Sequence, residues 1–199
     1  NQYYSTIREQ MQQGVRPKSC ATCYKLEDKG QVSYRQKYLS SMPIEHKEGP
    51  SHLEIKVGSL CNLKCVMCYP GASSLHQHEV EVMLEQGIEP PNAFNLDNTD
   101  LTIAKEHKGS SYADNLNLKD CTRICLTGGE PLVNKTTLLI LDRCINEGHS
   151  KHIALEIIRN LTTLNKAVID RLVQFNHAKL LVSWDHVDAA KAHYMRYPK

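Results

Sequence analysis

Apolar and polar positions follow two alternating periods over most of this 199-residue chain. Apolar residues two positions apart, as at Leu53 and Ile55, are typical of a β-strand with one buried face. Four short segments have the length and composition of strands, namely residues 53–57, 123–127, 153–158 and 180–184. We therefore expect a sheet in the second part of the chain.

Helical spacing separates these strands. Leu138, Leu141 and Ile145 recur every three or four residues, and Gly148 is suited to end the helix that carries them. Asn165 is suited to cap a further helix before the last strand. Strand and helix in alternation predict an α/β fold whose parallel strands are joined by right-handed helical crossovers.

The chain before the first strand has a different character. Residues 1–50 form a predicted N-terminal extension, with a helix at 3–13 and a C-x-x-C pair at Cys20 and Cys23. Two thiols provide only half of a full tetrahedral metal site, so a reduced thiol pair and a site shared between subunits both remain open. The pair is followed by a polar linker.

The core is expected over residues 51–199, interrupted by a long insertion at 71–120. This insertion combines an acidic helical segment at 77–86 with a run rich in Ser, Asn and Asp. Connections of this length in compact domains tend to be lids or binding loops, so we expect substrate specificity to reside there.

Composition narrows the class of protein without naming it. A hydrophobic content of 41% with 23% charged residues is ordinary for a globular protein, and a net charge of +2 without single-sign blocks indicates neither a nucleic-acid partner nor a membrane surface. The apolar runs are far shorter than the roughly 20 residues that span a bilayer, so we expect a cytoplasmic protein. The eight cysteines then favour metal ligation and reduced thiols over disulfides, and the start at Asn1 suggests a fragment.

Three of these cysteines carry the strongest chemical signal. Cys61, Cys65 and Cys68 lie in one loop directly after the first predicted strand. Three thiolates can hold three corners of a cubane cluster, whereas a 4Fe-4S cluster that only transfers electrons normally takes four. An iron without a protein thiolate is open to a small molecule, as the catalytic position of many metal sites is. The loop is therefore suited to a 4Fe-4S cluster with one open iron.

A second motif follows the second predicted strand. Gly128, Gly129, Glu130 and Pro131 combine a glycine pair, which lets backbone approach a bound molecule, with a carboxylate. With the cysteine loop, this segment resembles the CxxxCxxC and GGEP motifs of the radical S-adenosylmethionine (radical SAM) superfamily. The resemblance implies a partial (β/α)6 barrel, of which about four strands are visible here. Its active site is expected in the loops at the carboxyl ends of the strands.

The resemblance also implies the cofactors and the reaction. The three cysteines would bind the 4Fe-4S cluster, the fourth iron would be chelated by S-adenosylmethionine (SAM), and the GGEP segment would hold the methionine amino group. Reduction by an external flavodoxin- or ferredoxin-like donor would cleave SAM to a 5′-deoxyadenosyl radical, which abstracts hydrogen from a peptide or small-molecule substrate. The cofactor thus supplies the difficult chemistry and the protein positions it.

Other positions match SAM-binding segments of the family. The stretch RNLT resembles T-N-G-T, which makes Asn160 a candidate SAM ligand, although Arg159 and Leu161 depart from the family residues. An ordinary turn explains Asn160 equally well. Met67 precedes the third cysteine, where many members have an aromatic residue against adenine, and Tyr69 is an alternative source of that contact.

The end of the chain resembles members with SPASM or twitch extensions. Ser183 and Asp185 match their S-x-D-G segment and would hydrogen-bond SAM or substrate, while His186 replaces the glycine. Arg196 would pair with a carboxylate through its planar fork, or be a solvated surface charge. The segment from Cys20 also resembles a C-x-x-C stretch that precedes the core in some twitch-domain proteins.

A second class of function stays open at this point. The cysteine spacing is near that of plant-type ferredoxins, so one of the remaining cysteines could close the cluster. The protein would then be a non-catalytic iron–sulfur or zinc protein that transfers electrons or acts as a scaffold. The GGEP segment favours the enzyme, because an electron carrier has no use for a backbone cradle at a neighbouring strand end. Cys121, Cys125 and Cys144 are expected to be buried small hydrophobes.

Overall fold

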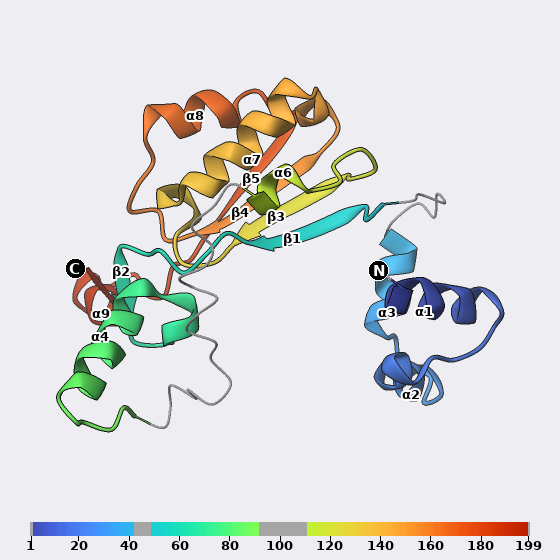
Figure 1. Ribbon diagram of the computed structural model, residues 1–199, viewed down its shortest axis with the longest axis horizontal. Coiled ribbons are helices and arrows are strands. Elements are labelled where there is room, and N and C mark those ends of the chain that lie inside the picture. Colours follow the sequence, from blue (N-terminus) through green and yellow to red (C-terminus); the bar gives the residue numbers. More distant parts are fainter. Residues whose placement is uncertain (1, 42–48, 92–110, 199) are drawn as a thin grey trace. The chain divides into compact units, whose positions relative to one another are not determined.

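In the computed structural model, a four-stranded parallel sheet forms the framework of the second part of the chain, residues 47–199 (Figure 1). In order across the sheet, its strands are β1 (His52–Lys56), β3 (Arg123–Thr127), β4 (Ala154–Arg159) and β5 (His177–Val182). All three neighbouring pairs are parallel. The predicted α/β class with four parallel strands is confirmed. β5 begins three residues before its predicted start. Its first residues are exposed and carry no apolar pattern, but they pair with β4 in the ladder.

The structure describes residues 2–41, 49–91 and 111–198. By its internal contacts the chain divides into an N-terminal unit, residues 1–46, and a C-terminal unit, residues 47–199. The middle of the predicted insertion and part of the predicted linker lie outside the described residues. No helix in the described part has both the length and the apolar character needed to cross a membrane.

Apolar side chains on one face of the sheet make the core. Ile55, Leu126, Ile157 and Leu180 lie side by side in the strand register, and the first three are almost fully buried. α7 (Lys135–Asn146) and α8 (Lys166–Leu172) cover this face, as Figure 1 shows. Burial of this apolar surface is the main stabilising term for the unit.

Local signals define both of these helices. The side chain of Asn134 accepts a hydrogen bond from the backbone N–H of Thr136 at the start of α7, and Gly148 follows its end with a φ of 78°. Asn165 caps α8 by accepting from the N–H of Val168 at 3.0 Å. The predicted cap and stop are therefore confirmed.

The opposite face of the sheet carries one row with charged side chains. Glu54, Cys125, Glu156 and Lys179 form the row next to the core row in the strand register. Glu54 and Lys179 are exposed, and Glu156 is half-buried. Because side chains alternate between the faces of a strand, the α7/α8 side is apolar and the other side can receive a polar molecule.

Shorter elements complete the C-terminal unit. β2 (Leu63–Cys65) pairs antiparallel with β6 (Arg196–Pro198), a ladder that the sequence did not predict. The helices and 3-10 turns outside the sheet are η2 (Pro70–Ala72), α4 (Ser74–Glu85), α6 (Ser111–Asp114), η5 (Pro131–Val133), η6 (His149–Lys151) and α9 (Ala189–Met195). α4 begins three residues before the predicted acidic helix.

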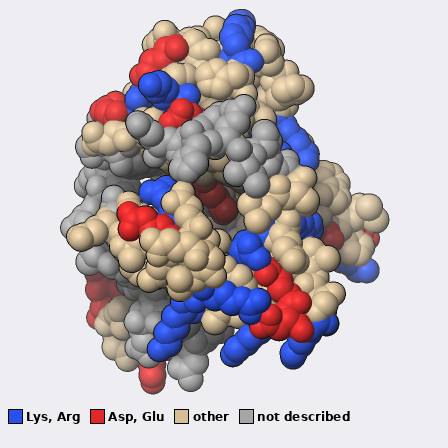
Figure 2. Space-filling model, turned by 90° about the vertical axis from the view of Figure 1, so that its right-hand side faces the viewer, with Lys and Arg blue, Asp and Glu red and all other residues tan. Residues whose placement is uncertain are grey.

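The N-terminal unit is a set of short helices. These are α1 (Gln2–Gln12), η1 (Lys18–Cys20), α2 (Ala21–Glu27) and α3 (Tyr34–Ser41), and α1 agrees with the predicted helix to within one residue. On the face of the molecule drawn in Figure 2, basic and acidic side chains lie among one another and among neutral ones.

Candidate functional site

A cavity of about 220 Å³ opens at the carboxyl ends of the parallel strands. Segments that follow β1, β3, β4 and β5 all contribute to its wall. Of the residues singled out from the sequence, it is lined by Cys61, Cys65, Met67, Cys68, Gly128, Gly129, Asn160, Ser183 and Arg196, and also by Tyr69. The structure thus brings together four segments that are far apart in the sequence, at the edge where parallel α/β sheets place their binding sites.

The cysteine loop is held in a tight turn. The backbone N–H of Cys68 donates to the carbonyl of Cys65 at 2.9 Å, and the thiol sulfur of Cys61 accepts from the N–H of Leu63 at 3.4 Å. The carbonyl of Cys65 lies 2.9 Å from Nε2 of the buried His76. These contacts hold the backbone of the loop and the thiol of Cys61.

Burial raises the pKa of all three thiols. For Cys61 and Cys65 the neighbouring thiol charges raise it further, whereas Arg196 lowers the pKa of Cys65 and Cys68. The loop therefore favours neutral thiols until a cation offsets the crowding of negative charge.

No three His, Cys, Asp or Glu side chains within the described residues converge on a point that could hold a single metal ion. A cubane cluster does not need such convergence, because each thiolate binds a different iron at its own corner. Three separate thiols around one cavity fit that requirement. Cys121, Cys125 and Cys144 are buried, as predicted, and do not line this cavity.

The glycine pair packs against the segment that leads into the cysteine loop. The N–H of Gly129 donates to the carbonyl of Gly58 at 2.9 Å, and the N–H of Glu130 donates to that of Leu60 at 2.8 Å. A Cβ on Gly129 would lie 2.3 Å from the carbonyl oxygen of Leu60, and one on Gly128 would lie 2.5 Å from that of Gly58. The sequence indicated close approach to a ligand; the structure shows close approach of backbone to backbone.

Glu130 is turned away from the cavity. Its side chain is fully buried, one carboxylate oxygen accepting from the N–H of Leu132 at 3.2 Å and the other from the N–H of Asn160 at 2.6 Å. It thereby joins the loop after β3 to the loop after β4. Neither Glu130 nor the buried Pro131 lines the cavity, so both shape its wall from behind.

Arg159, which precedes Asn160, also lines the cavity. It is 2% exposed, and its Nη2 donates to the carbonyl of Thr163 at 2.6 Å. Burial lowers the pKa of this guanidinium, and the charge of Glu130 raises it. Nothing in the sequence indicated that a guanidinium would be buried at this position.

Asn160 links the β4 loop to the cysteine loop. Its Nδ2 donates to Oδ1 of Asn62 at 3.0 Å, and its Oδ1 accepts from the N–H of Thr162 at 3.0 Å. Between them Leu161 adopts a φ of 61°, a left-handed conformation that favours glycine. The turn therefore keeps the backbone shape of a glycine-containing segment although the glycine is replaced.

Arg196 is committed to two partners. Its guanidinium forms an ion pair with Asp185, with Nη2 3.1 Å from Oδ1, and its Nη1 donates to the thiol sulfur of Cys65 at 3.6 Å. The β2–β6 ladder sets this contact, because Cys65 and Arg196 are partners in the register. Asp185 itself does not line the cavity, whereas Ser183 does, with its N–H donating to the carbonyl of Arg159 at 2.8 Å.

Met67 and Tyr69 form the apolar side of the cavity mouth. Both are about half exposed, at 51% and 46%. Lys56 lies over the Tyr69 ring, 5.7 Å from its centroid, and its Nζ donates to the carbonyl of Gly71 at 2.8 Å. Soft thioether and aromatic surface are both available to a flat ring system, as the sequence indicated.

Comparison with known proteins gives distant likenesses, and no family model matches the chain. Over 130 residues the chain is 27% identical to an uncharacterised protein of Methanocaldococcus jannaschii. The matched segment is 65% of this chain and 37% of that protein. The fold of this chain resembles the crystal structure of Streptococcus suis SuiB bound to the precursor peptide SuiA, with a TM-score of 0.48 and 15% sequence identity. It also resembles SuiB bound to SAM, with a TM-score of 0.49 and 14% sequence identity. Both cover 90% of this chain and 40% of SuiB. The chain thus spans about two fifths of the length of the proteins it matches.

Proposed function

We propose that the C-terminal unit contains a radical SAM active site, in which Cys61, Cys65 and Cys68 hold a 4Fe-4S cluster. The observation that carries this proposal is the convergence of three thiols with the GGEP, Asn160 and Ser183 segments around one cavity. When bound, the cluster and SAM supply a one-electron cleavage that yields a 5′-deoxyadenosyl radical. The chain's own part is to bind, orient and shield these groups.

The donor set fits a site-differentiated cluster. Thiolates are the usual protein ligands of iron–sulfur clusters, and these three are the cysteines that line the cavity within the described residues. Cys125, the cysteine on the polar face of the sheet, lies elsewhere in the register. The absence of a fourth thiol from the described wall supports the enzyme over the electron-transfer alternative, whose cluster would be closed by a cysteine.

The surrounding residues divide the binding task. The Asn160–Asn62 contact holds the β4 loop against the cysteine loop, and the buried carboxylate of Glu130 holds it to the β3 loop. Met67 and Tyr69 offer apolar surface for adenine at the mouth. The cavity is smaller than the about 300–1,000 Å³ of typical ligand pockets, so the cofactor would extend from it over the adjoining face of the sheet.

We place the substrate, a peptide or small molecule, along the polar row of the sheet. Glu54, Glu156 and Lys179 offer charges of both signs on the side away from α7 and α8. A polar molecule on this face would be next to the cavity at the strand ends. The reductant would be a flavodoxin- or ferredoxin-like protein.

The test is anaerobic reconstitution with iron and sulfide, followed by electron paramagnetic resonance of the reduced protein with and without SAM and an assay for 5′-deoxyadenosine. We expect a spectrum that shifts with SAM, and loss of the cluster and of 5′-deoxyadenosine in Cys65→Ala. Cys125→Ala, a matched loss of one cysteine away from the cavity, should retain both. A cluster whose spectrum ignores SAM, or one lost in Cys125→Ala, would favour the electron-transfer alternative.

A further inference from the structure

The N-terminal unit has almost no apolar core. Within residues 2–40 only Pro17 and Ser33 are buried, and no residue of α1, η1 or α2 is. Apolar side chains lie outside instead, with Val32 75% and Tyr34 73% exposed. Units near this size usually need a disulfide, a metal ion or association with another chain, because their cores are too small to offset the conformational entropy of the chain.

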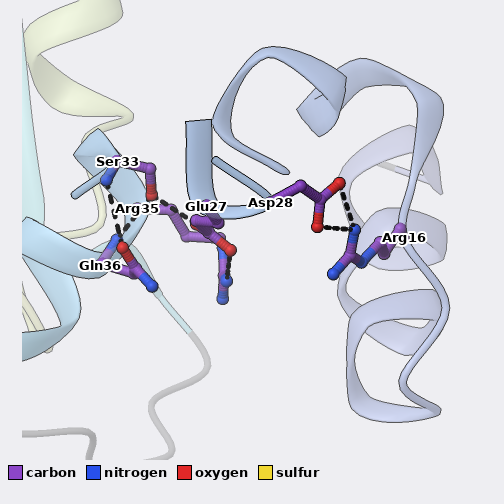
Figure 3. Close-up of polar contacts among 6 residues, drawn as sticks. All are labelled: Arg16, Glu27, Asp28, Ser33, Arg35 and Gln36. Carbon is purple, nitrogen blue, oxygen red and sulfur yellow. Dashed lines mark hydrogen bonds and ion pairs between the residues drawn. The ribbon is translucent and has the colours of Figure 1, made fainter. Parts of the chain in front are cut away.

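Ion pairs around one tyrosine hold the described helices together instead. Arg16 bonds both carboxylate oxygens of Asp28, at 2.7 and 2.9 Å, and Arg35 pairs with Glu27, as Figure 3 shows. The two guanidinium groups lie 4.8 and 4.9 Å from the centre of the Tyr24 ring. The Arg16–Asp28 pair is exposed and contributes little, about 0–1 kcal/mol, whereas the side chains of Arg35 and Glu27 are only 28% and 10% exposed and tie α3 to α2. The network thereby orients α2.

Cys20 and Cys23 lie at the start of the helix that this network orients. Cys20 is the residue before α2 and Cys23 is in its first turn, and both are free and half-buried. The two residues between them match the spacing at which structural zinc sites take a pair of thiolates. The charge of Cys23 acts on Arg35, so a cation of the network lies close to the thiols.

This pair is two ligands short of a closed site. Within the described residues no third His, Cys, Asp or Glu joins it to make a metal-binding group. A second copy of the chain carries the same pair, and four cysteines at tetrahedral positions are a complete structural zinc site. We propose that Cys20 and Cys23 from two copies of this chain bind one zinc ion between them and so join the N-terminal units.

A shared zinc ion would meet both needs of the unit. It adds the metal and the association that a coreless unit of this size lacks. A two-fold interface places each element against its own copy, so exposed side chains beside the thiols would be covered in pairs. Four thiolates around Zn²⁺ leave a net charge of −2, which a cation within a few ångströms can stabilise. This inference does not depend on the proposed function of the C-terminal unit.

The test uses the full chain, purified anaerobically, with its zinc content and its mass in solution measured together. We expect a dimer in which Cys20→Ser and Cys23→Ser each lose half an equivalent of zinc per chain relative to wild type, and become monomers. Thr22→Ala is the matched control, since Thr22 is exposed between the two cysteines, and it should keep both metal and dimer.

Cobalt substitution adds a spectroscopic readout of the ligand set and of the stoichiometry. In wild type, titration with Co²⁺ should show the absorption spectrum of a tetrahedral tetrathiolate site. The part of this absorption that Cys20→Ser lacks, which we call pair-specific, should saturate at one cobalt per two chains. The proposal is overturned by one pair-specific metal per chain, by a monomer that retains the metal, or by a protein two mass units lighter through a Cys20–Cys23 disulfide.

Discussion

The contact between Arg196 and Cys65 predicts that two neighbouring residues shift the cluster's reduction potential in opposite directions. The guanidinium donates to the Cys65 sulfur and is paired with Asp185. Reduction adds negative charge to a cluster, and a nearby cation or N–H donor stabilises the reduced form. Arg196→Gln should therefore lower the potential, whereas Asp185→Asn, which leaves the cation unbalanced, should raise it.

The distance sets the magnitude. Two unit charges 3.6 Å apart interact by about 1.2 kcal/mol in bulk water and by about 4.6 kcal/mol at an effective dielectric constant of about 20. A tenfold change in a one-electron equilibrium is about 59 mV, so these limits correspond to about 50 and about 190 mV. Because the side chains of Arg196 and Asp185 are 22% and 24% exposed and balance each other, we expect shifts near the lower limit.

Redox titration of the reconstituted protein, followed by electron paramagnetic resonance, measures both shifts without a substrate. Lys64→Gln is the control, because Lys64 is a cation next to Cys65 on β2 but pairs with Glu79 at 2.6 Å. With iron content equal to wild type, shifts of the same sign in Arg196→Gln and Asp185→Asn, or no shift in either, would refute the electrostatic reasoning. A protein that takes up no cluster would instead refute the proposed function.

Three further predictions concern the scaffold. Gly129→Ala should cost about 1–3 kcal/mol of stability and weaken cluster uptake, because its Cβ would meet the Leu60 backbone. Gly148→Ala meets open space and carries only the strain of its left-handed φ of 78°, so it should lose stability but keep its cluster uptake; urea unfolding and iron content distinguish the two variants. Glu130→Gln should destabilise the protein by about 1–3 kcal/mol, since an amide leaves one of two buried N–H donors without an acceptor, and an unchanged urea midpoint would contradict this. Burial raises the pKa of Cys144 from 9.0 to about 12, so the folded protein keeps the thiol proton up to a higher pH than the unfolded chain does. Stability should then fall between those pH values, with a slope of up to about 1.4 kcal/mol per pH unit that is smaller in Cys144→Ala.

Most of the architecture was predictable because its signals are local. Alternation at Leu53 and Ile55 marked β1, and the Asn165 cap marked α8, where the side chain bonds a backbone three residues away. The sequence also indicated that the segments at the strand ends would meet, because parallel strands carry their carboxyl ends to one edge. Ser183, near the end of the chain, duly lies on the same cavity wall as Met67.

The roles of several side chains were not predictable. Glu130 belongs to the motif by its place in the sequence, but only the packed structure shows its carboxylate directed into the interior. Leu161 departs from the family pattern, and yet its backbone has the left-handed conformation that a glycine would have. Both outcomes depend on the residues that surround Glu130 and Leu161 in the folded protein, and the intrinsic conformational preference of a residue type does not predict them.

The sequence by itself determined the elements and the donor atoms, since a thiol is a soft ligand wherever the chain places it, and strand or helix periods are properties of adjacent residues. The tertiary structure decided which groups face one another. The β2–β6 ladder joins segments 131 residues apart at Cys65 and Arg196, and the glycine pair is required by a backbone approach across two loops. Contacts between residues so far apart in the sequence form only when the whole unit folds. Closing so long a loop costs conformational entropy, and packing elsewhere in the unit offsets that cost.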